Sequence, residues 1–272
     1  MKGPELMMKN FLELSQRLCF SAVILVLLSL AAFAQKETPP VGGQPKPFVF
    51  PAQDTYTLKN GMKVTLVQYG AVPKVAMQTV VRAGSLNERA DQRWISDMVS
   101  TLLKEGTSSR SAEQIALETA EMGGSIFTSA ATDKTTIGGE VLSEFDTRFL
   151  SLMADVVMNP KFAAEDMEKV RENKLRELTI NRAAPGSLAW EKFRQVIFAG
   201  HAYGSIYPTE AGLKAYTLQD VKTFYYNQFG AARAHLYVVG QFDAAKVKAG
   251  IEKAFGNWKK GPEPIRNVPV IN

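Results

Sequence analysis

Histidine and cysteine, which carry much of the metal and nucleophilic chemistry of proteins, are scarce in this chain. The sequence contains two histidines, His201 and His235, and one cysteine, Cys19. A helical zinc site needs two histidines four residues apart on one face, whereas these two lie far apart in the sequence. His201 falls in a Gly-His-Ala-Tyr-Gly turn and His235 in an apolar segment. We therefore expect a turn hydrogen bond for His201 and partial packing for His235.

Other catalytic arrangements are not indicated by the sequence. It has no Gly-rich phosphate-binding loop and no Gly-x-Ser-x-Gly nucleophile turn. Charged pairs such as Glu140 with Glu144, or Asp133 with Lys134, have spacings that occur in any charged helix or loop. The net charge of +5 is spread among acidic residues and forms no basic stripe with aromatics. This distribution argues against a nucleic-acid partner.

The first 34 residues have the order of a secretory signal peptide. Basic residues precede an apolar run at 18–33, which ends in Ala-Phe-Ala at 32–34. The run is shorter than the roughly 20 residues of a spanning helix, so we expect cleavage and export, to a bacterial periplasm. An uncleaved N-terminal membrane anchor is the alternative. Because Cys19 lies inside the run, cleavage would leave no disulfide and no thiolate.

The rest of the chain has the composition of one large folded domain. It is 272 residues long and 46% hydrophobic, with 22% charged residues. Residues 35–54 are rich in Pro and Gly and are predicted to form an extended linker. Residues 55–260 carry the regular elements. Residues 261–272 are predicted to be a tail, or the start of a linker to a second domain.

Regular elements are indicated by turn residues and by the period of the apolar positions. Asn60-Gly61 joins two short alternating segments and predicts a hairpin. Strands are predicted at 56–58, 64–67, 75–82, 125–131, 135–141 and 234–239, and helices at 93–105, 111–122, 144–158, 164–182, 187–198, 218–229 and 244–258. Groups of strands separated by groups of helices favour an α+β fold, with a mostly antiparallel sheet covered by helices.

Five segments in order resemble the N-terminal domain of the insulinase/pitrilysin zinc peptidases, the family of the mitochondrial processing peptidases. The segments are Leu58–Val64, Val81–Ser85, Leu103–Thr107, Ala199–Gly204 and Leu236–Asp243. The resemblance extends over about three quarters of the chain. It implies a single peptidase-like half-shell domain.

The resemblance also shows which chemistry is missing. Active members carry His-x-x-Glu-His on the helix before a Gly-Thr, where the histidines hold zinc and the glutamate activates its water. In this sequence the three positions are Asp97, Ser100 and Thr101, and Glu177 matches the third ligand on a later helix. Hydroxyls are poor zinc ligands. The resemblance therefore implies a non-catalytic member without zinc. Without a metal, Glu177 is expected to be a partner in helical ion pairs.

A function follows from the same resemblance. Some family members pair with a subunit that lacks the motif, and the chain ends shortly after this first domain. We therefore expect a non-catalytic partner of a periplasmic peptide-degrading or processing peptidase, or a half-shell completed by a second domain. The strand after Gly124 matches the one that receives substrate as an added strand. The candidate peptide contacts are Ser125, Ile126, Phe127, Thr128 and Ser129, of which Phe127 could equally be core.

Two other functions stay open at this point. One is a degenerate metallopeptidase with a weak carboxylate metal site at Asp97 and Glu177. The other is a free-standing peptide-binding module. Peptide specificity, and whether the partner is identical or different, do not follow from the sequence.

Overall fold

The computed structural model describes residues 17–18, 20–23, 42–44, 47 and 49–264. Met1–Val49 and Phe50–Asn272 form separate units, and the fold below is that of the second. Most of the predicted signal peptide and linker lies outside the described residues, and the division of the chain into four segments stays a prediction. Among the described residues, no helix is both long enough and apolar enough to cross a membrane.

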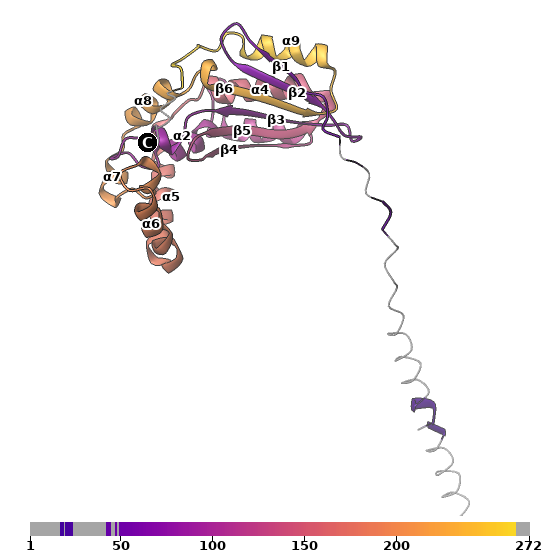
Figure 1. Ribbon diagram of the computed structural model, residues 1–272, viewed down its shortest axis with the longest axis horizontal. Coiled ribbons are helices and arrows are strands. Elements are labelled where there is room, and N and C mark those ends of the chain that lie inside the picture. The colour runs from indigo at the N-terminus through magenta and orange to yellow at the C-terminus, as the bar shows by residue number, and fades with distance from the viewer. Residues whose placement is uncertain (1–16, 19, 24–41, 45–46, 48, 265–272) are drawn as a thin grey trace, which may run out of the picture. The chain divides into compact units, whose positions relative to one another are not determined.

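A six-stranded sheet forms the centre of the fold (Figure 1). The strand order is β1-β2-β6-β3-β5-β4, and every neighbouring pair is antiparallel except β2 with β6. The strands are β1 (Asp54–Thr57), β2 (Lys63–Gln68), β3 (Lys74–Val81), β4 (Ser125–Ala130), β5 (Thr135–Leu142) and β6 (Ala234–Gly240). The predicted mostly antiparallel sheet is confirmed.

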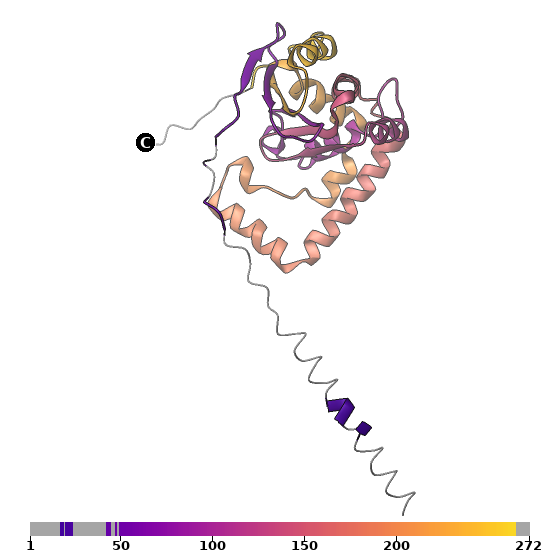
Figure 2. The same cartoon turned by 90° about the vertical axis from the view of Figure 1, so that its right-hand side faces the viewer.

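Helices follow the strands in groups, as expected for an α+β fold. The α-helices are α2 (Ile95–Leu103), α3 (Ala112–Glu121), α4 (Asp146–Met158), α5 (Ala164–Ala183), α6 (Pro185–Ile197), α7 (Glu210–Ala215), α8 (Leu218–Gln228) and α9 (Ala244–Phe255). Single 3₁₀ turns occur at Ser85–Asn87, Ser143–Phe145, Ala202–Gly204 and Ala231–Arg233. In Figure 2, α5 and α6 form a V that extends away from the sheet.

One face of the sheet is buried beneath α4, which packs against α9. Thr79 of β3 lies on this face, where its hydroxyl donates to Met153 Sδ of α4 at 3.7 Å. Gly139 of β5 leaves room for Phe149, whose ring would lie 2.7 Å from any added Cβ. The Asn60 amide donates to the Phe255 carbonyl at 2.7 Å and so fixes the first hairpin to α9.

The opposite face of the sheet is open to solvent across its middle. Phe127 of β4 pairs with Gly138, which pairs with Gln78, which in turn pairs with Tyr237. The Phe127 side chain is 41% exposed and Tyr237 is 38% exposed. Phe127 therefore lies on the open face and outside the buried core.

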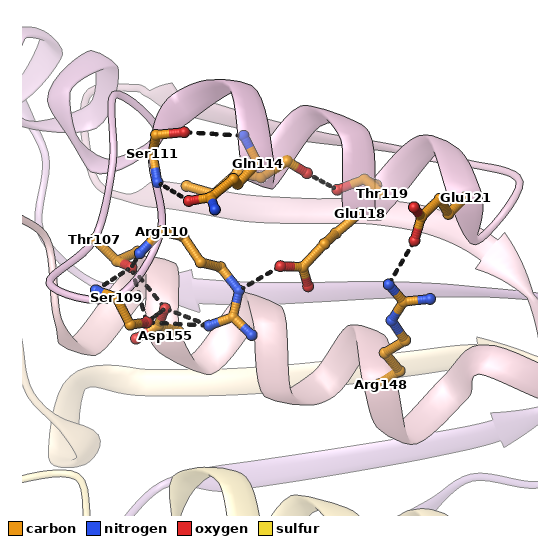
Figure 3. Close-up of polar contacts among 11 residues, drawn as sticks. Thr107, Ser109, Arg110, Ser111, Gln114, Glu118, Thr119, Glu121, Arg148 and Asp155 are labelled. Atoms are coloured by element: carbon orange, nitrogen blue, oxygen red, sulfur yellow. Dashed lines mark hydrogen bonds and ion pairs between the residues drawn. The ribbon is translucent and has the colours of Figure 1, made fainter.

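The loop that follows α2 is fixed to α4 by one carboxylate (Figure 3). Asp155 accepts hydrogen bonds from Thr107 Oγ1 at 2.7 Å and from Ser109 Oγ at 2.9 Å, and it forms an ion pair with Arg110 at 2.7 Å. Burial raises the pKa of Asp155, but these hydrogen bonds, with one from Asn159, outweigh it and lower the pKa below its ordinary value. The loop from Thr107 to Arg110 is thereby held against α4.

Candidate functional site

The three motif positions lie on one side of α2. The Asp97 side chain is 39% exposed, whereas Ser100 is buried. The Thr101 hydroxyl donates to the Asp97 carbonyl at 2.9 Å, within the helix. Spacings of three and four residues place the three side chains on the same helical face.

Glu177 of α5 comes close to Asp97, as the predicted third-ligand position requires, but a lysine lies between them. Lys174 Nζ is 2.8 Å from Glu177 Oε2 and 3.6 Å from Asp97 Oδ1. The same ammonium lies 5.4 Å from the centre of the Trp94 ring, a cation–π distance. The cation between the two carboxylates is thus supplied by the chain itself.

The pKa of Asp97 reflects this arrangement. Burial raises the pKa of Asp97 most, Lys174 lowers it and the nearby Glu177 raises it again, so that the net pKa is above the ordinary value. The Asp97 carboxylate thus already has the Lys174 ammonium as a counter-ion.

The residues at this position do not fit a zinc ion. Zinc sites use His, Cys or carboxylate, with three protein ligands even where a site is catalytic. The groups present are two carboxylates, two hydroxyls and an ammonium. Within the described part of the chain, no cluster of three or more His, Cys, Asp and Glu could hold a metal. No step of a metal-dependent mechanism can be assigned to these residues.

The N-terminus of α2 is held by a residue that sequence reasoning missed. Glu88 is buried, and its carboxylate accepts from Ser96 N at 2.9 Å, Ser96 Oγ at 2.5 Å and Trp94 N at 3.2 Å. The Arg93 guanidinium lies 3.8 Å away. Burial raises the pKa of Glu88 to about 7, against the lowering effect of these hydrogen bonds and of Arg93. No capping spacing in the sequence marks Glu88, because it precedes the helix by several residues.

Trp94, the N-cap residue before α2, has an unusual backbone conformation. Its φ of 69° is in the left-handed region, which is uncommon for a bulky residue. The indole Nε1 donates to the Ile206 carbonyl at 2.9 Å, and the ring packs edge-on against Tyr207. These contacts, with the Glu88 cap, fix the ring against which Lys174 rests.

A small cleft joins α2 to the end of the edge strand. Its volume is about 200 Å³, and its lining includes Asp97, Glu88, the residues 130–132 at the end of β4, and Arg194 of α6. The cleft therefore brings the motif helix, the candidate peptide strand and α6 together.

The candidate peptide contacts lie on β4, the last strand of the sheet. Within the described residues, β4 pairs only with β5, which leaves its outer edge without a strand partner. Ser125, Phe127 and Ser129 are exposed, and Ile126 and Thr128 are half-buried. The Thr128 hydroxyl is buried without a hydrogen-bond partner among the described residues. Whether these five residues contact peptide stays a prediction.

The two histidines have the roles expected of them. His201 Nδ1 accepts from Tyr203 N at 3.2 Å in the turn after α6. His235 Nε2 forms a hydrogen bond with Thr65 Oγ1 at 2.9 Å, and the imidazole ring stacks on the ring of Tyr237. Burial, and then Lys63, lower the pKa of His235. Neither histidine is among the residues that line the cleft with Asp97.

Lys174→Ala is expected to lower the free energy of unfolding at pH 7 by about 1 kcal/mol, because Asp97 and Glu177 would face each other without a cation. In a Glu177→Gln background the same change should cost much less. Urea denaturation of the four proteins measures both costs. An equal cost in the two backgrounds would contradict the three-group arrangement.

Comparison with known families identifies the family of this chain. The chain matches the family described as insulinase (peptidase family M16) over residues 63–206, more than half of its length. The chain belongs to the insulinase family. Residues 215–271 match the description peptidase M16 inactive domain. The resemblance inferred from the five sequence segments is therefore confirmed.

Individual proteins from other organisms are similar to this chain in sequence or in structure. An uncharacterized zinc protease of Rickettsia felis is 29% identical over 205 residues, covering 75% of this chain and 50% of that protein. The crystal structure of a Helicobacter pylori protease has a TM-score of 0.75 at 21% identity, covering 82% of this chain and 54% of that one. A peptidase M16 inactive domain from Pseudomonas fluorescens has a TM-score of 0.73 at 22% identity, covering 79% and 53%. The chain spans about half the length of the curated relatives it matches.

Proposed function

We propose that this chain is a non-catalytic half-shell domain of an exported insulinase-family peptidase assembly. The observation that carries the proposal is Lys174, whose ammonium occupies the space between the carboxylates at a motif position and at the third-ligand position. A fixed ammonium satisfies the two carboxylates electrostatically, but it cannot bind or activate a water molecule as a metal ion does.

The general base is missing as well. Ser100 replaces the motif glutamate and is buried in α2. A serine hydroxyl is a poor proton acceptor near neutral pH unless a base activates it. Without a metal and without a base, hydrolysis of a peptide bond has no support at this position, and binding is the function that the site favours.

Peptide binding is supported by the edge of the sheet. The outer side of β4 offers backbone donors and acceptors without a strand partner in the described part of the fold, and an extended peptide can pair with such an edge. Phe127 and Tyr237 provide partly exposed apolar surface on the adjoining open face. The proposal assigns peptide contact to Ser125–Ser129.

Association with a second half-shell domain is supported by α6. None of its residues is buried. Five of its apolar side chains are more than 40% exposed: Leu188, Trp190, Phe193, Val196 and Ile197. Apolar patches of this kind mark interaction surfaces. Because the chain spans about half the length of its relatives, the proposed occupant is a second insulinase-type half-domain. Export to a periplasm rests on residues 1–34 alone.

The test uses the purified full chain and an insulinase-family peptidase from the same genome that retains His-x-x-Glu-His. We expect the two to co-elute in gel filtration with light scattering, and the chain to change the turnover of a peptide by that peptidase. A Trp190→Ser/Phe193→Ser variant should lose both effects, while the control Tyr226→Ser, also an exposed aromatic, should keep them. No co-elution together with no change in turnover would contradict the proposal.

A further inference from the structure

Arg194 of α6 has a guanidinium that is held on several sides. Its Nε donates to the Tyr203 carbonyl at 2.8 Å. Its Cζ lies 5.1 Å from the centre of the Phe198 ring and 5.9 Å from each of the Trp190 and Tyr203 rings. Stacking on aromatic rings is a favoured environment for arginine because the planar cation is weakly hydrated. The position of the guanidinium is thus fixed in advance of any ligand.

The two terminal nitrogens of Arg194 are left available. Neither forms a hydrogen bond or an ion pair with any residue that the structure describes. The nearby carboxylate of Glu191 is engaged by Arg182 instead. A guanidinium with two free, parallel N–H groups matches the two oxygens of a carboxylate.

Arg194 lines the cleft at the end of β4. The same 200 Å³ space is bounded by residues 130–132, which follow β4, and by Asp97. Asp97 already pairs with Lys174, and the Glu88 carboxylate is turned into the start of α2. A carboxylate that enters the cleft therefore finds Arg194 as a cation without a counter-ion.

We propose that this cleft is a carboxylate-recognising subsite for a peptide that pairs with β4, with Arg194 as its anion-binding residue. The proposal rests on the peptide-binding part of the proposed function and adds a ligand class, peptides that carry a carboxylate at this end of the strand. Tyr203 is the positioning residue, since its carbonyl orients Nε and its ring covers the guanidinium. Its hydroxyl, which donates to Asp133 at 2.7 Å, holds the ring in place.

The direction in which a peptide pairs with β4 determines which of its carboxylates reaches the cleft. The cleft lies at the C-terminal end of β4. A peptide parallel to β4 would place its C-terminus there, so the carboxylate would be terminal. An antiparallel peptide would place its N-terminal residues there, and the carboxylate would have to come from an Asp or Glu side chain.

The test uses three ten-residue peptides of one Ala/Val/Thr sequence, each labelled with a BODIPY dye that carries no carboxylate. The first has a free C-terminus, the second is C-terminally amidated, and the third is amidated and carries one Glu near its N-terminus. Binding to the full chain is followed by fluorescence anisotropy for wild type, Arg194→Gln, Arg194→Lys and the control Arg176→Gln, an exposed arginine of α5.

Wild type is expected to prefer the first or the third peptide over the second, and the preferred one identifies the source of the carboxylate. Arg194→Gln should lower the affinity for that preferred peptide by about tenfold and leave the affinity for the second peptide unchanged. Arg194→Lys should have an intermediate affinity, and Arg176→Gln should bind like wild type. Equal binding of all three peptides, or binding that survives Arg194→Gln, would overturn the subsite alone. If no peptide binds, the proposed binding of peptide to β4 is contradicted as well. The proposed association with a second half-domain is tested separately and would be unaffected.

Discussion

Asp97→His, Thr101→His and Lys174→Ala, introduced together, are expected to create a zinc site in this chain. The two histidines would lie four residues apart on one face of α2, next to Glu177 of α5, which the fold already brings to this face. Two histidines and a glutamate are a donor set that zinc accepts. Removal of Lys174 frees Glu177 and removes a positive charge that would repel the ion.

The expected gain in zinc affinity over wild type is on the order of a thousandfold or more. At a zinc concentration one hundred times the dissociation constant, the variant should be stabilised by about 2.7 kcal/mol. Calorimetric titration and thermal denaturation measure the two effects. Because Ser100 still replaces the general base, we expect no peptide hydrolysis.

Two controls separate the contributions to that site. Addition of Glu177→Gln should abolish most of the gain, and retention of Lys174 with both histidines should reduce it. A folded triple variant with no affinity for zinc would show that α2 and α5 do not present their side chains as described.

Glu88→Ala is expected to lower the free energy of unfolding by about 3 kcal/mol at pH 5, because three donors at the start of α2 lose their buried acceptor. Trp94, whose backbone is in the left-handed region, would also lose the hydrogen bond that holds it there. Glu113→Ala removes an exposed acidic residue from the first turn of α3 and should cost less than about 1 kcal/mol. Urea denaturation compares the two, and similar costs would contradict the capping role.

The effect of Glu88 should also depend on pH. Its pKa is raised from 4.5 to about 7 in the folded protein, so between these values the folded state holds a proton that the unfolded state has released. Its contribution to stability is therefore complete below pH 4.5 and is lost as pH rises through about 7, by up to about 3 kcal/mol. The stability difference between wild type and Glu88→Ala should shrink from pH 5 to pH 8. A difference that grows with pH would contradict the raised pKa.

The fold could be predicted from the sequence because its local signals agree with its tertiary structure. Asn60-Gly61 predicts the first hairpin, and Gly61 adopts the positive φ of 94° that such a turn needs. Ser111 and Gln114 form a capping box at the start of α3, close to the predicted helix start. The short helix α7, Glu210–Ala215, was not predicted because six residues with an internal glycine give too little periodicity.

The site could be predicted only in part, because its main features are contacts between distant segments. Asp97 and Glu177 could be located through a motif, and the structure brings them together. The sequence shows Lys174 only as one of many charged residues on a predicted ion-paired helix. Only the packing of α5 on α2 places its ammonium between the carboxylates of Asp97 and Glu177. Glu88 and Arg194 likewise follow no local pattern, since the cap and the cleft form only when the chain has folded.

The zinc content of the purified wild-type chain tests the central claim most directly. The full chain is dialysed against excess zinc, freed of unbound metal and measured by mass spectrometry of the metal, with Glu177→Gln treated in parallel. Because Lys174 fills the position between the two carboxylates, we predict much less than one zinc per chain and no difference between the two proteins. One zinc per wild-type chain that is lost in Glu177→Gln would contradict the account and would favour a degenerate metallopeptidase.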